Sequence, residues 1–156
     1  MPIPESRERG TLPPGLHAAS LREAVARFGS ATEQRRRLAG LLAEVVAAAR
    51  PYPTIKRVLV WGSFVTDAEA PRDLDYSIVL SVRHNDTVIA QRHRRFLTPL
   101  DARRYYGVDR GFLEVYDWPL ESYLEFMDFI CYDRRRNACG IVEIHVRGEF
   151  LEEDPA

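Results

Sequence analysis

Apolar residues recur at helical spacing in the second quarter of the chain. Six of them follow the i, i+3, i+4, i+7 pattern of one buried helix face: Leu38, Leu41, Leu42, Val45, Val46 and Ala49. Ser30-Ala-Thr-Glu33 has the form of a capping box and predicts the start of this helix, while Arg50-Pro51 predicts its end. Residues 34–37, one glutamine and three arginines, lie on the opposite face. We expect them to be solvated, with contact to a phosphate or an RNA as the alternative.

Two further helices are indicated by capping boxes. Ser20-Leu-Arg-Glu23 is followed by apolar residues on one face, and Gly29 predicts the end of that helix. Ser122-Tyr-Leu-Glu125 precedes a densely apolar stretch, which predicts a helix packed in the core.

Four shorter apolar stretches predict strands. The run at 58–61 is continuous, and the stretch 73–80 begins with two acids and continues into an apolar interior, as in buried strands. The stretch 111–119 alternates, and 141–146 is the last predicted strand. We therefore expect an α/β (α+β) fold in which the N-terminal helices pack on a small mixed β-sheet. Residues 1–14, which contain four prolines, are expected to form an extended arm, and residues 15–156 a single domain.

Composition narrows the class of protein. A chain of 156 residues that is 46% apolar fits one globular domain. Its net charge of −1 does not indicate a protein that coats nucleic acid, although local basic patches could still contact one. Neither an apolar run of 18 residues nor a basic and apolar leader occurs, so we expect a cytoplasmic protein without membrane contact. Cys131 and Cys139 lack metal-ligand spacing and are expected to be reduced thiols.

The stretch from Val58 to Leu80 carries the strongest chemical signal. Side chains alternate along a strand, so Asp73 and Asp75 are expected to point the same way, with Cα atoms about 6.6 Å apart. Two carboxylates aimed at one point repel each other unless a cation lies between them. Gly62 allows a ligand to approach the backbone closely, and Ser63 offers a hydroxyl and an N–H to a phosphate.

This pattern resembles the signature of a known superfamily. A hydrophobic residue, Gly62-Ser63, nine intervening residues and Asp-hydrophobic-Asp-hydrophobic are similar to the motif of the DNA polymerase β-like nucleotidyltransferases, and the short chain is similar to their minimal bacterial members. The resemblance covers residues 58–80. It implies that Gly62 and Ser63 hold a nucleoside triphosphate and that Asp73 and Asp75 bind the Mg²⁺ ions bridging its phosphates. It further implies transfer of a nucleoside monophosphate, with ATP as the expected donor, to an acceptor hydroxyl with release of pyrophosphate.

The superfamily usually has a third carboxylate on a later strand. Glu114, between Leu113 and Val115, is similar to that position, which implies a general base or a further metal ligand. Asp117 is the competing choice. Glu143 and His145 share a face of the last predicted strand, and we interpret them as residues at a sheet edge, with a position near the acids as the alternative.

A second functional class stays open. The minimal members of the superfamily include antitoxins that modify or mask ribonuclease toxins, so the resemblance also permits a catalytically silent domain that binds a nucleotide or a protein partner. The basic segment at residues 92–95 could grip a triphosphate, but we interpret it as surface. Phosphate-binding loops, dinucleotide fingerprints, nucleophile elbows and zinc-protease motifs are missing from the sequence.

Overall fold

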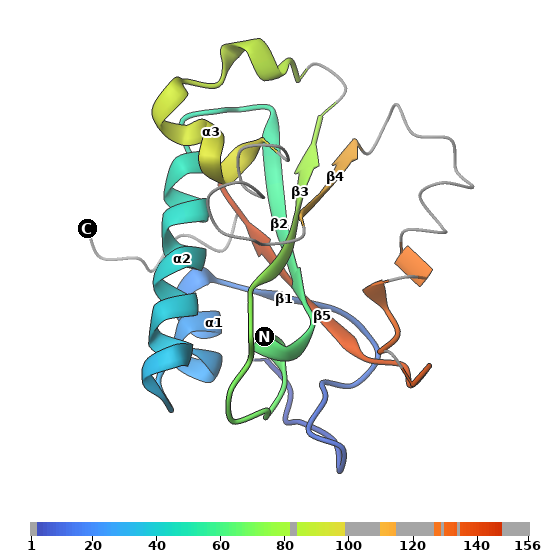
Figure 1. Ribbon diagram of the computed structural model, residues 1–156. Helices are drawn as coiled ribbons and strands as arrows, with labels where there is room; N and C mark the ends of the chain where they lie inside the picture. The colour runs from blue at the N-terminus through green and yellow to red at the C-terminus, as the bar shows by residue number, and fades with distance from the viewer. Residues whose placement is uncertain are drawn as a thin grey trace.

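The computed structural model describes residues 3–81, 84–98, 110–114, 127–128, 130–133 and 135–147. Its centre is a five-stranded mixed sheet with the order β1-β5-β2-β3-β4 (Figure 1). The strands are β1 (Gly15–Ala19), β2 (Ile55–Trp61), β3 (Asp75–Leu80), β4 (Arg110–Glu114) and β5 (Gly140–His145). β2 is antiparallel to both β3 and β5, whereas β1 runs parallel to β5 and β4 parallel to β3. The expected α/β fold with a small mixed sheet is confirmed.

Three helices lie on one side of this sheet: α1 (Leu21–Phe28), α2 (Glu33–Ala49) and α3 (Gln91–Leu97). The capping box at the start of α1 is present, because the Ser20 hydroxyl accepts from the Glu23 N–H and the Glu23 carboxylate accepts from the Ser20 N–H. α2 starts two residues later than predicted. Its cap is Thr32, whose Oγ1 accepts from the Arg35 N–H at 3.1 Å.

The main core fills the space between the helices and the sheet. All six residues of the predicted α2 stripe are buried, as are the sheet residues that face them: Val58, Val60, Tyr76, Ile78, Val142 and Ile144. Alternation along β2, β3 and β5 sends the other residues of these strands to the opposite face.

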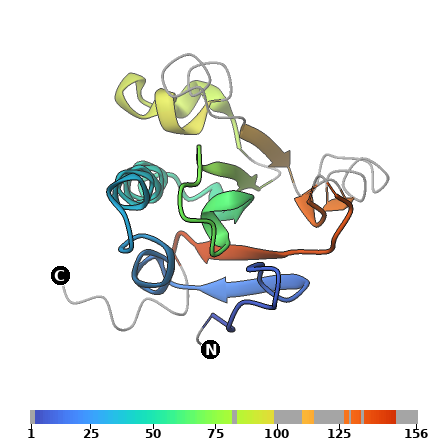
Figure 2. The same ribbon diagram turned by 60° about the horizontal axis from the view of Figure 1, so that its bottom comes forward.

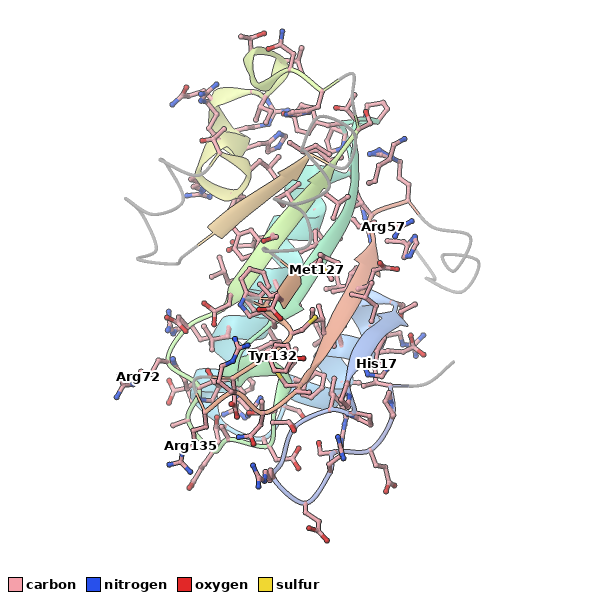
Figure 3. The ribbon with its side chains drawn as sticks, turned by 90° about the vertical axis from the view of Figure 1, so that its right-hand side faces the viewer. His17, Arg57, Arg72, Met127, Tyr132 and Arg135 are labelled. Carbon is pink, nitrogen blue, oxygen red and sulfur yellow. The ribbon has the colours of Figure 1, made fainter. Side chains whose placement is uncertain are left out.

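A smaller apolar cluster covers part of that second face. Leu59, Val79 and Ile141 from the sheet pack with Ile130, which is 1% exposed, and Met127 packs against them. Figure 2 shows the helices and this second layer on opposite sides of the sheet, and Figure 3 looks onto the second face with Met127 over its middle. The part of the sheet around Leu59, Val79 and Ile141 is therefore covered on both faces, as continuous apolar strands require.

The N-terminal arm is docked onto the domain. Leu12 is 1% exposed within the main core, and Thr11 forms an isolated antiparallel bridge with Thr66. The Gly10 carbonyl accepts from the Asp67 N–H at 2.8 Å. The arm thus contacts the segment between β2 and β3, where the candidate site lies.

Membrane-spanning helices are not found in the part of the chain that the structure describes.

Candidate functional site

The Gly-Ser pair forms a tight turn at the end of β2. Gly62 has φ 75° and ψ −161°, a region that essentially only glycine enters, and a short 3₁₀ helix, η1 (Ser63–Val65), follows. The Ser63 carbonyl accepts from the Thr66 N–H at 3.3 Å and from the Thr66 hydroxyl at 2.7 Å. The chain reverses here instead of continuing the strand.

Asp75 lies directly against this turn. It is the first residue of β3 and the register partner of Trp61. A Cβ atom added to Gly62 would lie 3.2 Å from the Asp75 Cγ and closer still to Oδ2. Glycine is therefore required at position 62 by its backbone angles and by the neighbouring carboxylate. The structure brings Asp75 next to the Gly62-Ser63 turn.

Asp73 lies just before β3, in a segment that belongs to no strand, whereas the sequence predicted a strand that includes Asp73. Leu74 and Tyr76 are fully buried on the helix side, whereas Asp73 and Asp75 are half-buried. Alternation within β3 puts Asp75 on the face away from the helices, because its neighbour Tyr76 belongs to the main core. Among the described residues, no group of three or more His, Cys, Asp or Glu side chains is arranged to hold a metal ion. A pair of carboxylates suits Mg²⁺ nevertheless, since this ion is commonly held by one or two carboxylates together with substrate phosphates and water.

Glu114 does not join this pair. β4 runs parallel to β3, and its backbone register places Glu114 beside Leu80, at the opposite end of β3 from Asp75. Five residues along a strand separate the backbone of position 114 from that of Asp75 by about 16 Å. The register therefore does not support Glu114 as the third carboxylate. Asp117 lies outside the described residues.

Glu143 and His145 do not lie at a sheet edge, contrary to the interpretation from sequence. β5 lies inside the sheet, between β1 and β2. The Glu143 carboxylate accepts from Arg57 Nη1 at 3.0 Å and lies 2.8 Å from His145 Nε2. Leu59 pairs with both Glu143 and Ser77, so Glu143 is two strands from β3, and its Cα is about 12 Å from that of Asp75. Apolar side chains of the smaller cluster lie between them, so Glu143 does not belong to the Asp75 site either.

The first turn of α2 contains a residue that sequence analysis missed. Arg35 was expected on the solvated face, but it is only 4% exposed, and its guanidinium donates to four backbone carbonyls. Burial lowers the pKa of Arg35, and the nearby Asp67 opposes this shift. A signal was available in the sequence, because Arg35 lies one turn before Leu38 on the buried stripe.

The other basic segment lies elsewhere. Residues 92–95 belong to α3, near the end of the sheet opposite to the loop between β2 and β3 (Figure 1). Arg92 and Arg95 are exposed, in agreement with the surface interpretation. This segment is therefore not placed to contact a phosphate beside Asp75.

One family model matches residues 4–145, a range that contains the whole Gly62 and Asp75 site. The chain belongs to the DUF6932 family. DUF6932 is described as a family of unknown function, so membership assigns no activity to the site. No curated protein and no solved structure matches this DUF6932 chain.

Proposed function

We propose that this DUF6932 protein is a Mg²⁺-dependent nucleotidyltransferase that transfers AMP from ATP to an acceptor hydroxyl. The observation that carries the proposal is the packing of the Asp75 carboxylate on the Gly62 backbone at the turn into Ser63. Local sequence alone predicts a glycine turn and a pair of acids, but not that the two would touch. Their contact is the arrangement that the resemblance to the nucleotidyltransferases implies.

The reaction needs little covalent chemistry from the protein. The acceptor oxygen attacks the α-phosphorus, the bond from that phosphorus to the oxygen bridging to the β-phosphate breaks, and pyrophosphate leaves. The acceptor proton passes to solvent or to a base that we do not assign. Bound Mg²⁺ would neutralise charge on the phosphates, and positioning supplies most of the remaining catalysis.

Each residue of the site has a distinct role in this proposal. Asp73 and Asp75 supply the carboxylate oxygens that hold the metal ions. Ser63 follows the turn, and its N–H and hydroxyl are both groups of the kind that donates hydrogen bonds to a phosphate oxygen. Gly62 keeps the space above its Cα open for the Asp75 carboxylate.

One observation favours a second candidate function. The third carboxylate expected from the resemblance is not found near Asp75 among the described residues, since both Glu114 and Glu143 lie too far away. A domain that binds a nucleotide or a protein partner without catalysis, as in an antitoxin, would need only the turn and the acids.

The decisive experiment uses ATP labelled at the α-phosphate, with Mg²⁺ and a panel of acceptors that includes the protein itself, RNA and proteins encoded beside it. We expect transferred label, and Asp75→Asn should reduce it at least a hundredfold. Glu114→Gln is the matched control, because it makes the same carboxylate-to-amide change about 16 Å away along the sheet and should leave transfer unchanged.

Three results would separate the candidates. Transfer that survives Asp75→Asn contradicts the proposed site. Transfer lost in Glu114→Gln would restore that residue as the third carboxylate. A partner or nucleotide that binds equally well with Asp75→Asn, with no label transferred by the unmodified protein, supports the silent binding domain.

A further inference from the structure

The segment between β2 and β3 is held in place by one buried guanidinium. Arg35 Nη1 donates to the Phe64 carbonyl at 2.8 Å, Nη2 to the Thr66 carbonyl at 2.7 Å, and Nε to the Ala68 carbonyl at 3.1 Å. Nη1 also donates to the Phe28 carbonyl at the end of α1, at 3.0 Å. Arg35 thus connects α1 and α2 to the residues that directly follow the Gly-Ser turn.

The neighbouring side chain holds the other end of the same segment. Gln34 Nε2 donates to the Pro71 carbonyl at 3.1 Å and to the Arg72 carbonyl at 3.3 Å, immediately before Asp73. Arg37 Nε in turn donates to Gln34 Oε1 at 3.1 Å, which fixes the orientation of the amide. Arg72 itself projects outward from the sheet (Figure 3). The backbone that leads into the acids is therefore attached to the first turn of α2.

We propose that Gln34 and Arg35 are positioning residues that set the two halves of the site separately. Arg35 fixes the turn that would contact the triphosphate, and Gln34 fixes the approach to Asp73 and thereby the metal half. This inference rests on the proposed function, because it assigns the two halves to a nucleotide and a metal ion.

The chemistry of the guanidinium explains why arginine is needed at this position. Residues 62–74 contain only the short η1 helix, so their carbonyls lack the partners that a regular element would provide. Arginine offers five N–H donors in a rigid plane and remains charged, whereas lysine offers three donors at one point. A lysine at position 35 could keep a charge there but could not reach the Phe64, Thr66 and Ala68 carbonyls at once.

A role in positioning differs from a role in stability alone. If Arg35 and Gln34 only stabilised the fold, their replacement would weaken metal and nucleotide binding together, in proportion to the stability lost. Separate positioning predicts that each replacement weakens mainly one ligand. The two ligands must therefore be measured independently on folded protein.

The test measures binding of Mn²⁺ alone, and of a non-hydrolysable ATP analogue in saturating Mn²⁺, by titration calorimetry. Gln34→Ala should weaken Mn²⁺ about tenfold, the size typical when a group supporting a metal ligand is removed. Arg35→Lys should weaken the analogue about tenfold while Mn²⁺ affinity stays within about twofold. Arg36→Ala is the control, since Arg36 is exposed and donates to the Ser30 carbonyl outside the loop.

The outcomes are distinguishable. A parallel loss of both ligands in both variants, or no loss in either, overturns the positioning inference and leaves the proposed function standing. If the unmodified protein binds neither Mn²⁺ nor the analogue, the proposed function and the inference both fail. If Arg35→Lys is unfolded at the assay temperature, Arg37→Ala is measured instead. This change removes the donor to the Gln34 amide, so it must lower the affinity for Mn²⁺ selectively. Unchanged Mn²⁺ affinity overturns the inference.

Discussion

Replacing Gly62 with alanine tests the contact on which the candidate site depends. At φ 75° and ψ −161° a residue with a Cβ atom is strained by about 1–3 kcal/mol. The added methyl group would also lie 3.2 Å from the Asp75 Cγ and still closer to Oδ2, so the carboxylate must move. We expect Gly62→Ala to lower both the free energy of unfolding and the affinity for the metal ion.

The size of the effect follows from these costs. For a chain of this length, 1 kcal/mol corresponds to a shift in Tm of about 2–4 °C, so Gly62→Ala should melt roughly 2–12 °C lower. Mn²⁺ affinity should fall about ten- to a hundredfold, because the displaced carboxylate is a proposed ligand. Thermal unfolding monitored by circular dichroism and Mn²⁺ calorimetry measure the two quantities.

Gly40 provides a control with the same chemical change. It is exposed on α2, and a Cβ atom there would meet nothing within 4 Å. Gly40→Ala should therefore raise stability by about 0.5–1 kcal/mol, the usual gain in a helix interior, and leave Mn²⁺ binding unchanged. If Gly62→Ala melts like the unmodified protein and binds Mn²⁺ equally well, the close packing of Asp75 on Gly62 is wrong.

Three further predictions concern other parts of the molecule. Burial, and secondly the neighbouring Arg92, lowers the pKa of His93 in the folded protein. As the pH falls, the unfolded chain therefore binds a proton at His93 at a higher pH than the folded protein does. The stability from neutral His93 is present above about pH 6.5 and is lost as the pH falls below it, and His93→Gln should flatten this part of a plot of Tm against pH. Burial raises the pKa of Cys131 and Cys139, so alkylation by iodoacetamide should be slower at pH 8 than for a thiol of the unfolded chain; equal rates contradict this. The buried Tyr76 hydroxyl donates to a carbonyl near the end of α3 at 2.7 Å, so Tyr76→Phe should cost about 1 kcal/mol in chemical denaturation.

Local signals predict the elements that carry the acids. The α2 stripe, the α1 capping box and the runs that become β2 and β3 each depend on residues close together in sequence. β1 is different. Gly15-Leu-His-Ala-Ala19 has no β-branched residue, and it forms a strand because β5, at the other end of the described chain, pairs with it. A single sequence contains no local sign of that partner.

The candidate site also contains some features that local sequence predicts and others that depend on residues distant in sequence. Local sequence predicts the turn at Gly62-Ser63 and the pair of acids Asp73 and Asp75. That the turn and the acids meet is implied only by the resemblance to the nucleotidyltransferases. The triplet around Glu114 identifies a strand but not its register, and the register decides which end of β3 it reaches. For Arg35, the charge of the residue indicated solvent, whereas its helical position indicated the core. The carbonyls left unpaired by an irregular loop resolved that conflict in favour of burial.

The place of β5 in the sheet affects the order in which the protein can assemble during synthesis. β5 is the last strand of the described chain, yet it lies between β1 and β2, which leave the ribosome much earlier. β2 and β3 are close in sequence and can pair at once, whereas β1 must wait for a neighbour. The glycine turn and the aspartates can thus form in a nascent chain whose β2 still has an open edge. Until β5 inserts there, that edge is the place where a chaperone, or another unfinished chain, would bind.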